Sequence, residues 1–321
     1  MMQQSGAIAT AKSMSDSVTV TVPATTANLG PGFDCIGAAL KLYNSVTFSR
    51  MQPSASTETP MVEISVTGAE ADRVSLNSDN LAYQSFVKLY QHLDKSPPPV
   101  QIQIQLGVPL ARGLGSSATA IVSGLLGANA LAGNPLSLAE VTELAIAIEG
   151  HPDNVVPALL GNCQLSVAEG NRWEICQIPW HSDIIPVVAI PNFELSTVEA
   201  RRVLPTAYSK ADAIFNTAHF GLLVRGLETG NRQWLQVALA DRIHQPYRYS
   251  LIHGYETVQI AARKAGAMGV VISGAGPTLL ALTDTETAVT VANAMTAAWK
   301  QQGVEADVRS LEIDVKGARI D

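Results

Sequence analysis

Residues 109–118 (PLARGLGSSA) combine glycines and serines directly before a long run of small apolar residues. Gly113 and Gly115 allow a ligand to approach the backbone closely, and Ser116 and Ser117 offer hydroxyl donors. The free N–H groups and the dipole at the start of a helix favour an anion. The segment therefore predicts a phosphate site. The structural alternative is a tight strand-to-helix turn that needs glycine for packing.

Two common nucleotide-binding motifs fit this segment poorly. A Walker A loop has Lys directly after its last glycine, whereas Ser116 follows Gly115 here and the loop contains no Lys. Residues 113–118 match the dinucleotide pattern G-x-G-x-x-A. That fingerprint also needs a second strand ending in an acid about 20 residues later, but Gly-Asn-Pro and another helical pattern follow instead. A P-loop nucleotidase and a dehydrogenase are both disfavoured.

The surrounding sequence alternates between strand and helix patterns. Period-two alternation and short apolar runs predict strands at 17–22, 62–67, 100–108, 164–168, 185–190 and 269–273. Helical spacing predicts helices at 80–93, 116–132, 138–150, 209–226 and 231–243. Pro23 is expected to end the first strand, so that residues 23–34 (PATTANLGPGFD) form a shaped loop.

Length and composition indicate a globular protein of two domains. The 321 residues are about twice a common domain length, with a boundary expected near 160–180. The net charge of −7 gives no general positive field, so we expect no nucleic-acid partner. Because no apolar run reaches roughly 18 residues and the N-terminus lacks a secretory apolar core, we expect no membrane contact and a cytoplasmic location. Cys35, Cys163 and Cys176 are widely spaced and are expected to be reduced thiols.

Three segments together resemble the motifs of the GHMP small-molecule kinases, in the same order. They are residues 23–34, 109–118 and 273–278 (SGAGPT), with 149–154 (EGHPDN) between the second and third. The resemblance implies an α+β fold of two domains, the first like domain 2 of ribosomal protein S5 and the second ferredoxin-like. We accordingly expect a flexible segment at 1–16, an ATP-binding domain at 17–165 and a C-terminal domain at 166–321.

Within this family, the chain most closely resembles the branch that phosphorylates the side-chain hydroxyl of L-homoserine with ATP and Mg²⁺. The segments that carry this closer resemblance are 23–34, 149–162 (EGHPDNVVPALLGN) and 244–248 (HQPYR). A homodimer is also a family-level expectation. The resemblance implies that Asn80 lies near the adenine and that the phosphates contact Pro109, Leu110, Ala111, Arg112, Gly113, Leu114, Gly115, Ser116 and Ser117.

The resemblance also implies a metal site and catalytic groups. Ser117 and Glu143 are expected to approach Mg²⁺. Glu143 lies roughly 160° around its helix from the apolar stripe, so it faces either a cleft or solvent. Asp153 is the candidate for orienting or deprotonating the acceptor hydroxyl, and its structural alternative is a helix N-cap. Asn28 is expected to hold the same hydroxyl.

An α-amino acid acceptor needs a cation for its carboxylate and an acid for its ammonium group. By resemblance, Arg201 and Arg248 bind the carboxylate and Asp34 meets the ammonium group, although Arg202 and Arg242 are close in sequence and are alternatives. The remaining residues expected to line the acceptor site are His151, Asn154, Thr197 and Gly274.

Two alternatives to a homoserine-phosphorylating enzyme stay open. The first is a GHMP kinase with another hydroxyl acceptor, such as mevalonate or a sugar, which has no use for a clamp that holds both a carboxylate and an ammonium group. The second is a nucleotide-binding regulator that has lost catalysis. The test for the first alternative is the set Asp34, Arg201 and Arg248, which only an amino-acid acceptor needs. The test for the second is turnover, which a non-catalytic regulator lacks.

Overall fold

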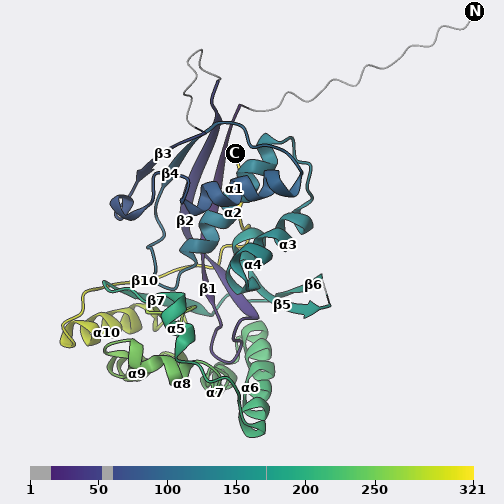
Figure 1. Ribbon diagram of the computed structural model, residues 1–321. Coiled ribbons are helices and arrows are strands. Elements are labelled where there is room, and N and C mark those ends of the chain that lie inside the picture. Colours follow the sequence, from purple (N-terminus) through teal and green to yellow (C-terminus); the bar gives the residue numbers. More distant parts are fainter. Residues whose placement is uncertain (1–15, 53–60, 171) are drawn as a thin grey trace, which may run out of the picture.

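The structure is a computed structural model that describes residues 16–52, 61–170 and 172–321 (Figure 1). The segment expected to be flexible, 1–16, lies outside the described residues except for Asp16. Two sheets, each with its own helices, build the molecule one above the other in Figure 1.

The first sheet has seven strands and is mostly antiparallel. Its main order is β11–β1–β2–β4–β3, and β5 lies beside both β2 and β6. Among the described residues, the β3–β4 pair is the one parallel pair of this sheet. The strands are β1 (Ser17–Ala27), β2 (Ile36–Arg50), β3 (Val62–Thr67), β4 (Val100–Gln105), β5 (Cys163–Glu169), β6 (Arg172–Ile178) and β11 (Arg319–Ile320).

Helices cover one face of this sheet because its strands alternate apolar and polar residues. In β1 the inward positions Val18, Val20 and Val22 are buried, and they belong to a core shared with the helices. In the middle of α2, a Cβ on Gly127 would lie 2.4 Å from the Phe48 ring, so the small residues of this helix permit close packing on β2. The helices are α1 (Leu81–His92), α2 (Ser116–Leu131), α3 (Leu138–Glu149) and α4 (Pro152–Leu160).

The second sheet is antiparallel, with the strand order β10–β7–β9–β8. Its strands are β7 (Ile185–Pro191), β8 (Gly269–Ile272), β9 (Leu279–Thr283) and β10 (Ala306–Ser310). Helices α9 (Tyr255–Lys264) and α10 (Ala288–Gln301) pack on this sheet around the buried Trp299. This order and the helix placement are those of a ferredoxin-like unit.

A helical insertion between β7 and β8 supplies one side of the site described below. It contains α5 (Thr197–Arg202), α6 (Lys210–Thr229), α7 (Arg232–Ala238) and α8 (Gln245–Arg248). Short 3₁₀ turns occur at η1 (Ala71–Arg73) and η2 (Tyr249–Leu251). A shared apolar core that includes Leu40, Leu114, Leu223 and Leu239 joins the two halves.

Several boundaries differ from the sequence-based expectation: β4 ends at Gln105 and α7 at Ala238, both earlier than expected, and two further differences bear on the site. Pro23 does not end β1, which continues to Ala27, because a register shift between Pro23 and Ala24 accommodates the proline. The expected domain boundary at 165/166 falls inside β5, because β5 and β6 form a hairpin that pairs with β2. The chain therefore leaves the first sheet after Ile178. Within the described part of the chain, no helix has the length and apolar character needed to cross a membrane.

Candidate active site

The glycine-rich segment forms the turn between β4 and α2 and leaves the start of α2 open. Gly115 is the N-cap with φ 69°, and no side chain caps this end of the helix. A Cβ on Gly115 would lie 2.0 Å from Thr25 Oγ1, and one on Gly113 would lie 2.3 Å from the Ser273 carbonyl oxygen. Because neither glycine has a side chain, the turn can pack this tightly. The same turn presents uncapped N–H groups of the kind that bind phosphate.

Three segments far apart in the sequence meet at this turn. The backbone N–H of Thr25 donates to the Leu114 carbonyl at 3.0 Å. The Ser273 hydroxyl donates to the Gly113 carbonyl at 2.7 Å, and Asn28 Nδ2 donates to the Gly274 carbonyl at 2.8 Å. The loops at 23–34, 109–118 and 273–278 are therefore joined by direct hydrogen bonds.

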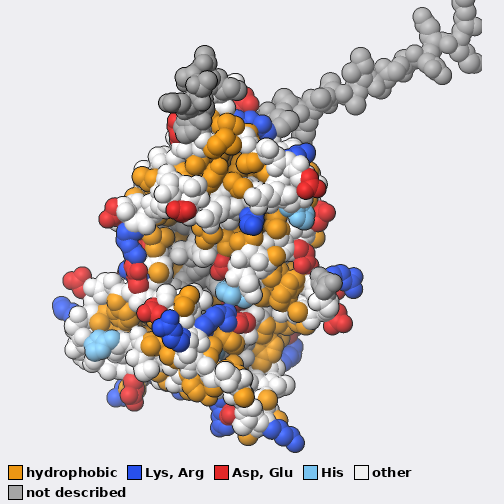
Figure 2. Space-filling view, in the orientation of Figure 1, with side chains coloured by type: hydrophobic (Ala, Val, Ile, Leu, Met, Phe, Trp, Pro, Cys, Tyr) orange, Lys and Arg blue, Asp and Glu red, His pale blue; other side chains and the backbone are white. Residues whose placement is uncertain are grey.

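Two cavities lie on either side of the α2 N-terminus, and both are lined by Ser116 and Ser117. The first, which we call the nucleoside pocket, has a volume of about 300 Å³ and an apolar wall from Val46, Ile104, Leu106 and Leu110, together with Asn80 and Arg73. The second, the acceptor pocket, has a volume of about 290 Å³. Its charged and polar lining includes Asn28, Asp34, Glu149, His151, Asp153, Asn154, Thr197, Arg201 and Arg248. Figure 2 shows acidic, basic and histidine side chains gathered near the level where the two halves of the molecule meet.

One side of the acceptor pocket carries an acid and two guanidinium groups. Asp34 and Arg201 form a bidentate pair, with Nη1–Oδ2 and Nη2–Oδ1 distances of 2.9 and 2.8 Å. Arg248 is almost fully buried, and both arginines lie over the Phe33 ring at 5.5 and 5.1 Å. Asn28 Oδ1 accepts from the Asp34 N–H at 2.9 Å and so supports the left-handed turn at Asp34.

The opposite side of the pocket carries Asp153 at the start of α4. Its Oδ1 lies 2.6 Å from His151 Nδ1 and also accepts from Asn154 Nδ2 at 3.3 Å. Asn154 Oδ1 in turn accepts from the Thr25 hydroxyl at 2.8 Å. Burial acts to lower the pKa of His151, but the hydrogen bond and charge of Asp153 and the charge of Glu149 outweigh it, so this pKa is raised.

A second carboxylate reaches the start of α2 from the end of α3. The Ser117 hydroxyl donates to Glu149 Oε2 at 2.9 Å. Burial raises the pKa of Glu149, although the Ser117 hydrogen bond and the charge of His151 oppose the rise. A hydroxyl and a carboxylate oxygen therefore lie together between the two pockets.

Both halves of the chain match models of one family. The model described as GHMP kinases N terminal domain matches residues 80–162, and the GHMP kinases C terminal model matches residues 223–301. The homoserine kinase of Crocosphaera subtropica is 69% identical over 94% of this chain and 97% of its own length. The chain belongs to the GHMP kinase family.

Solved structures agree with this assignment. The crystal structure of homoserine kinase from Cytophaga hutchinsonii matches with a TM-score of 0.86 and 28% identity, over 98% of this chain and 100% of that one. L. major mevalonate kinase, at 16% identity, matches with a TM-score of 0.67 over 92% of this chain and 95% of that one, which is a likeness of fold. The expected α+β fold of a two-domain GHMP kinase is confirmed.

In this GHMP kinase the structure brings most of the expected acceptor-site residues into one pocket. Asn28, Asp34, His151, Asp153, Asn154, Thr197, Arg201, Arg248 and Gly274 all line it, whereas Arg202 and Arg242 do not. Arg242 instead pairs with Asp212 at 3.4 Å on an exposed surface. Of the phosphate-loop residues, Ala111, Gly113, Gly115, Ser116 and Ser117 line the same pocket.

Glu143 does not line either pocket. Its side chain was expected to face either a cleft or solvent, and in the structure it faces solvent. Its side chain is exposed, and Oε1 accepts from the Trp173 N–H at 3.1 Å. The β5–β6 hairpin lies beside this face of α3, so the carboxylate is turned away from the phosphate loop. The carboxylate that does reach Ser117 is Glu149, which sequence reasoning missed although it begins the EGHPDN motif.

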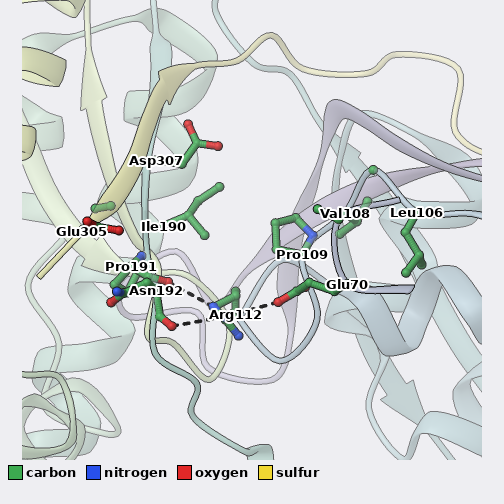
Figure 3. A pocket seen from close by; sticks show the side chains of 13 residues that line it. Glu70, Leu106, Val108, Pro109, Arg112, Ile190, Pro191, Asn192, Glu305 and Asp307 are labelled. Carbon is green, nitrogen blue, oxygen red and sulfur yellow. Dashed lines mark hydrogen bonds and ion pairs between the residues drawn. The ribbon is translucent and has the colours of Figure 1, made fainter. Parts of the chain in front are cut away.

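Arg112 also departs from the expectation that it binds phosphate, because its side chain points away from both pockets. Figure 3 shows it in a third cavity, bonded to Glu70 and to the Pro191 and Asn192 backbone. It further pairs with Glu194 at 3.0 Å. Arg112 is thus a clamp between the two halves of this GHMP kinase.

Three other residues of the expected nucleotide site lie in three different places. Leu114 is fully buried in the core between the two sheets. Pro109 lines the third cavity, which is the one in Figure 3. Asn80 lines the nucleoside pocket while its Oδ1 caps α1, at 3.0 Å from the Ala82 nitrogen.

Proposed function

We propose that this protein is a homoserine kinase, which transfers the γ-phosphoryl group of ATP to the side-chain hydroxyl of L-homoserine in threonine biosynthesis. The products are O-phospho-L-homoserine and ADP. The observation that carries this proposal is the acceptor pocket, which combines Asp34 with Arg201 and Arg248 directly beside the phosphate loop. Support also comes from the relatives named homoserine kinase, which include the one from Trichormus variabilis at 64% identity.

ATP is the phosphoryl donor of this family, and the two pockets suggest how it lies. We propose that the adenine enters the nucleoside pocket, where Ile104, Leu106 and Leu110 provide an apolar wall. The triphosphate then passes the uncapped N-terminus of α2, whose N–H groups and dipole favour its charge. The γ-phosphate reaches the acceptor pocket beside Ser116 and Ser117, which line both cavities.

Ser117 and Glu149 are the groups that we propose to hold Mg²⁺. Their oxygens lie 2.9 Å apart at the edge of the phosphate site, and Mg²⁺ prefers such hard oxygen donors together with phosphates and water. When bound, Mg²⁺ supplies positive charge against the charge of the phosphates.

We propose that the bonds between Asp34 and Arg201 break when the acceptor binds, and that its charged groups take their place. The ammonium group of L-homoserine binds Asp34, and its carboxylate binds Arg201 and Arg248. Arg201 exchanges Asp34 for the carboxylate and Asp34 exchanges Arg201 for the ammonium group, so neither is left unpaired when the site excludes water. The Phe33 ring, which lies near both guanidinium groups, adds a cation–π contact to each while the partner changes.

The hydroxyl is proposed to lie between Asp153 and Asn28. His151 and Asn154 both bond to Oδ1 of Asp153, so Oδ2 is free among the described residues to accept the hydroxyl proton. Asn28 Nδ2 uses one hydrogen on the Gly274 carbonyl and retains one for the hydroxyl oxygen. As the new O–P bond forms, the bond from the γ-phosphorus to ADP breaks and Asp153 Oδ2 takes the proton.

The test is ADP release by the purified protein with Mg-ATP and a panel of L-homoserine, L-threonine, mevalonate, galactose and shikimate. We expect a selective response to L-homoserine and a product whose mass is that of O-phospho-L-homoserine. Turnover of another acceptor instead would contradict the substrate and keep the family. Bound ATP with no turnover of any acceptor would favour the nucleotide-binding regulator.

A cytoplasmic location and a homodimer belong to the same proposal through the resemblance to the family. Light scattering on the purified full chain measures the oligomeric state directly. A mass near 68 kDa is roughly twice the 33.9 kDa of one chain and is the expected result.

A further inference from the structure

His244 lies behind Arg248, on the side away from the acceptor pocket, and is fully buried. It is the N-cap residue of α8, and Arg248 is the last residue of the same helix. His244 does not line the acceptor pocket. We propose that His244 is a positioning residue for the acceptor's carboxylate, because it accepts a hydrogen bond from Arg248 and thereby directs the remaining N–H groups of that guanidinium into the pocket. This inference rests on the proposed function.

A count of the Arg248 donors shows what remains for a ligand. The Nε–H donates to the Ala200 carbonyl at 3.0 Å. Nη1 has two hydrogens and two partners, the Gly274 carbonyl and His244 Nδ1, each at 3.2 Å. Among the described residues Nη2 has no hydrogen-bond partner, and it is not one of the buried polar atoms that lack a hydrogen bond. Both Nη2 hydrogens are therefore free for a carboxylate, and their direction depends on the two bonds that hold Nη1.

The bonding pattern allows one form of the His244 ring. A guanidinium can only donate, so Nδ1 must carry a lone pair. A carbonyl can only accept, so Nε2, which lies 2.9 Å from the Gly30 oxygen, must carry the hydrogen. The neutral Nε2–H tautomer satisfies both contacts, whereas an imidazolium would point an N–H at Arg248.

The surroundings keep this ring neutral and fixed. Burial lowers the pKa of His244 to about 4, and the nearby charge of Arg248 acts in the same direction, against the opposing charge of Asp241. The Phe33 ring stacks on the imidazole at 5.1 Å between centroids. Asp241 Oδ2 accepts from the His244 backbone N–H at 2.9 Å and fixes the start of α8. Because Phe33 covers a face of the ring and both ring nitrogens are bonded, Arg248 has a rigid support.

The two ring nitrogens can be separated by substitution. In His244→Asn the side-chain oxygen sits where Nδ1 was and can still accept from Arg248, but the bond to Gly30 is lost. In His244→Gln the amide N–H sits where Nε2 was and can still donate to Gly30, but the acceptor for Arg248 is lost. Both variants lose the stack on Phe33, so each is the matched control of the other.

The experiment measures KM for L-homoserine, KM for ATP and kcat for the full-length wild type and both variants. We expect His244→Gln to raise the L-homoserine KM roughly tenfold, because a buried donor of Arg248 loses its acceptor, with little change in the ATP KM. In His244→Asn we expect most of this rise in the L-homoserine KM to be absent. The reverse order, or equal effects, would mean that His244 acts only through Gly30 or general packing, and would overturn the proposal.

A measurement on the wild type covers the case in which neither variant folds. Nitrogen NMR of the ¹⁵N-histidine-labelled protein should show one histidine as the neutral Nε2–H tautomer throughout pH 5.5–8, and this signal should shift when L-homoserine is added. An Nδ1–H tautomer or an imidazolium at His244 would contradict the proposal. A wild type that does not turn over L-homoserine would instead refute the proposed function, so the two failures are distinguishable.

Discussion

Asp34 and Arg201, 167 positions apart in the sequence, face each other across the acceptor pocket through two parallel hydrogen bonds of 2.9 and 2.8 Å. The two groups carry the charges that an α-amino acid needs in a binding site. In the structure they neutralise each other. An acceptor with both an ammonium group and a carboxylate can replace this pair without leaving a charge unpaired, whereas an acceptor with only one of them leaves one member of the pair without a partner.

The Asp34→Asn variant tests this relationship. It should raise the KM for L-homoserine by on the order of 10- to 100-fold, because the ammonium group loses its ionic partner. The KM for ATP should stay nearly constant. Asp212→Asn is the matched control, since it breaks an exposed pair with Arg242 outside both pockets. An unchanged L-homoserine KM in Asp34→Asn would argue against an amino-acid acceptor.

The Asp153→Asn variant tests the role of the free Oδ2 atom. Removal of a group that takes a proton in the transition state lowers kcat by about 10²- to 10⁴-fold. The nucleoside pocket does not contain Asp153, so the ATP KM should change little. Steady-state kinetics with product detection measure both values. A kcat close to that of the wild type would show that Asp153 serves as a helix-terminal residue and does not take the proton.

Glu149→Gln and Glu143→Gln compare two carboxylates of the same helix. Glu149 bonds to Ser117 in the site, and Glu143 bonds to the Trp173 backbone on the surface. We expect Glu149→Gln to raise the Mg²⁺ concentration for half-maximal activity at least about tenfold, because a charged oxygen ligand is lost. Glu143→Gln should resemble the wild type. The opposite result from a Mg²⁺ titration would restore Glu143 as the metal ligand.

The raised pKa of His151 predicts a pH-dependent contribution to stability. Its pKa in the folded state is above the ordinary value of about 6.5, since Asp153 and Glu149 outweigh the effect of burial. The protonated ring therefore stabilises the fold fully below about pH 6.5, and this contribution is lost as pH rises through the folded pKa. Chemical denaturation should show a larger destabilisation by His151→Gln at pH 6 than at pH 9. Equal destabilisation at both values would contradict the charge effect.

The Arg112→Ala variant tests the clamp between the two halves. Its guanidinium is nearly buried and bonds to Glu70, Glu194 and backbone carbonyls of both halves. Loss of these bonds should lower the free energy of unfolding by on the order of 3 kcal/mol. Arg225→Ala, which removes an exposed pair with Glu228, should cost less than about 1 kcal/mol. Similar losses in the two variants would mean that Arg112 adds no more than a surface pair.

Local patterns in the sequence were sufficient for the elements that depend on neighbouring residues. The helix predicted at 138–150 and the strand predicted at 62–67 are both present, and the first is fixed locally by a capping box of Ser137 and Glu140 and by Gly150 at its end. A strand or helix of this kind follows from hydrogen bonds and side-chain spacing within a few residues. Pro23 is the exception, because its effect on β1 depends on how the partner strand β2 accommodates a bulge.

The tertiary structure decided which polar groups form the site. Helical periodicity placed Glu143 off the apolar stripe, but only the β5–β6 hairpin beside α3 determines that this carboxylate meets Trp173. The Glu149–Ser117 bond likewise depends on how the end of α3 lies against the start of α2. The direction of Arg112 was likewise set by carbonyls after β7, some 80 residues away in the chain. The motifs in the sequence identify the chemistry, because residue types limit what a loop can bind. The contacts that orient each charge come from segments that only folding brings together.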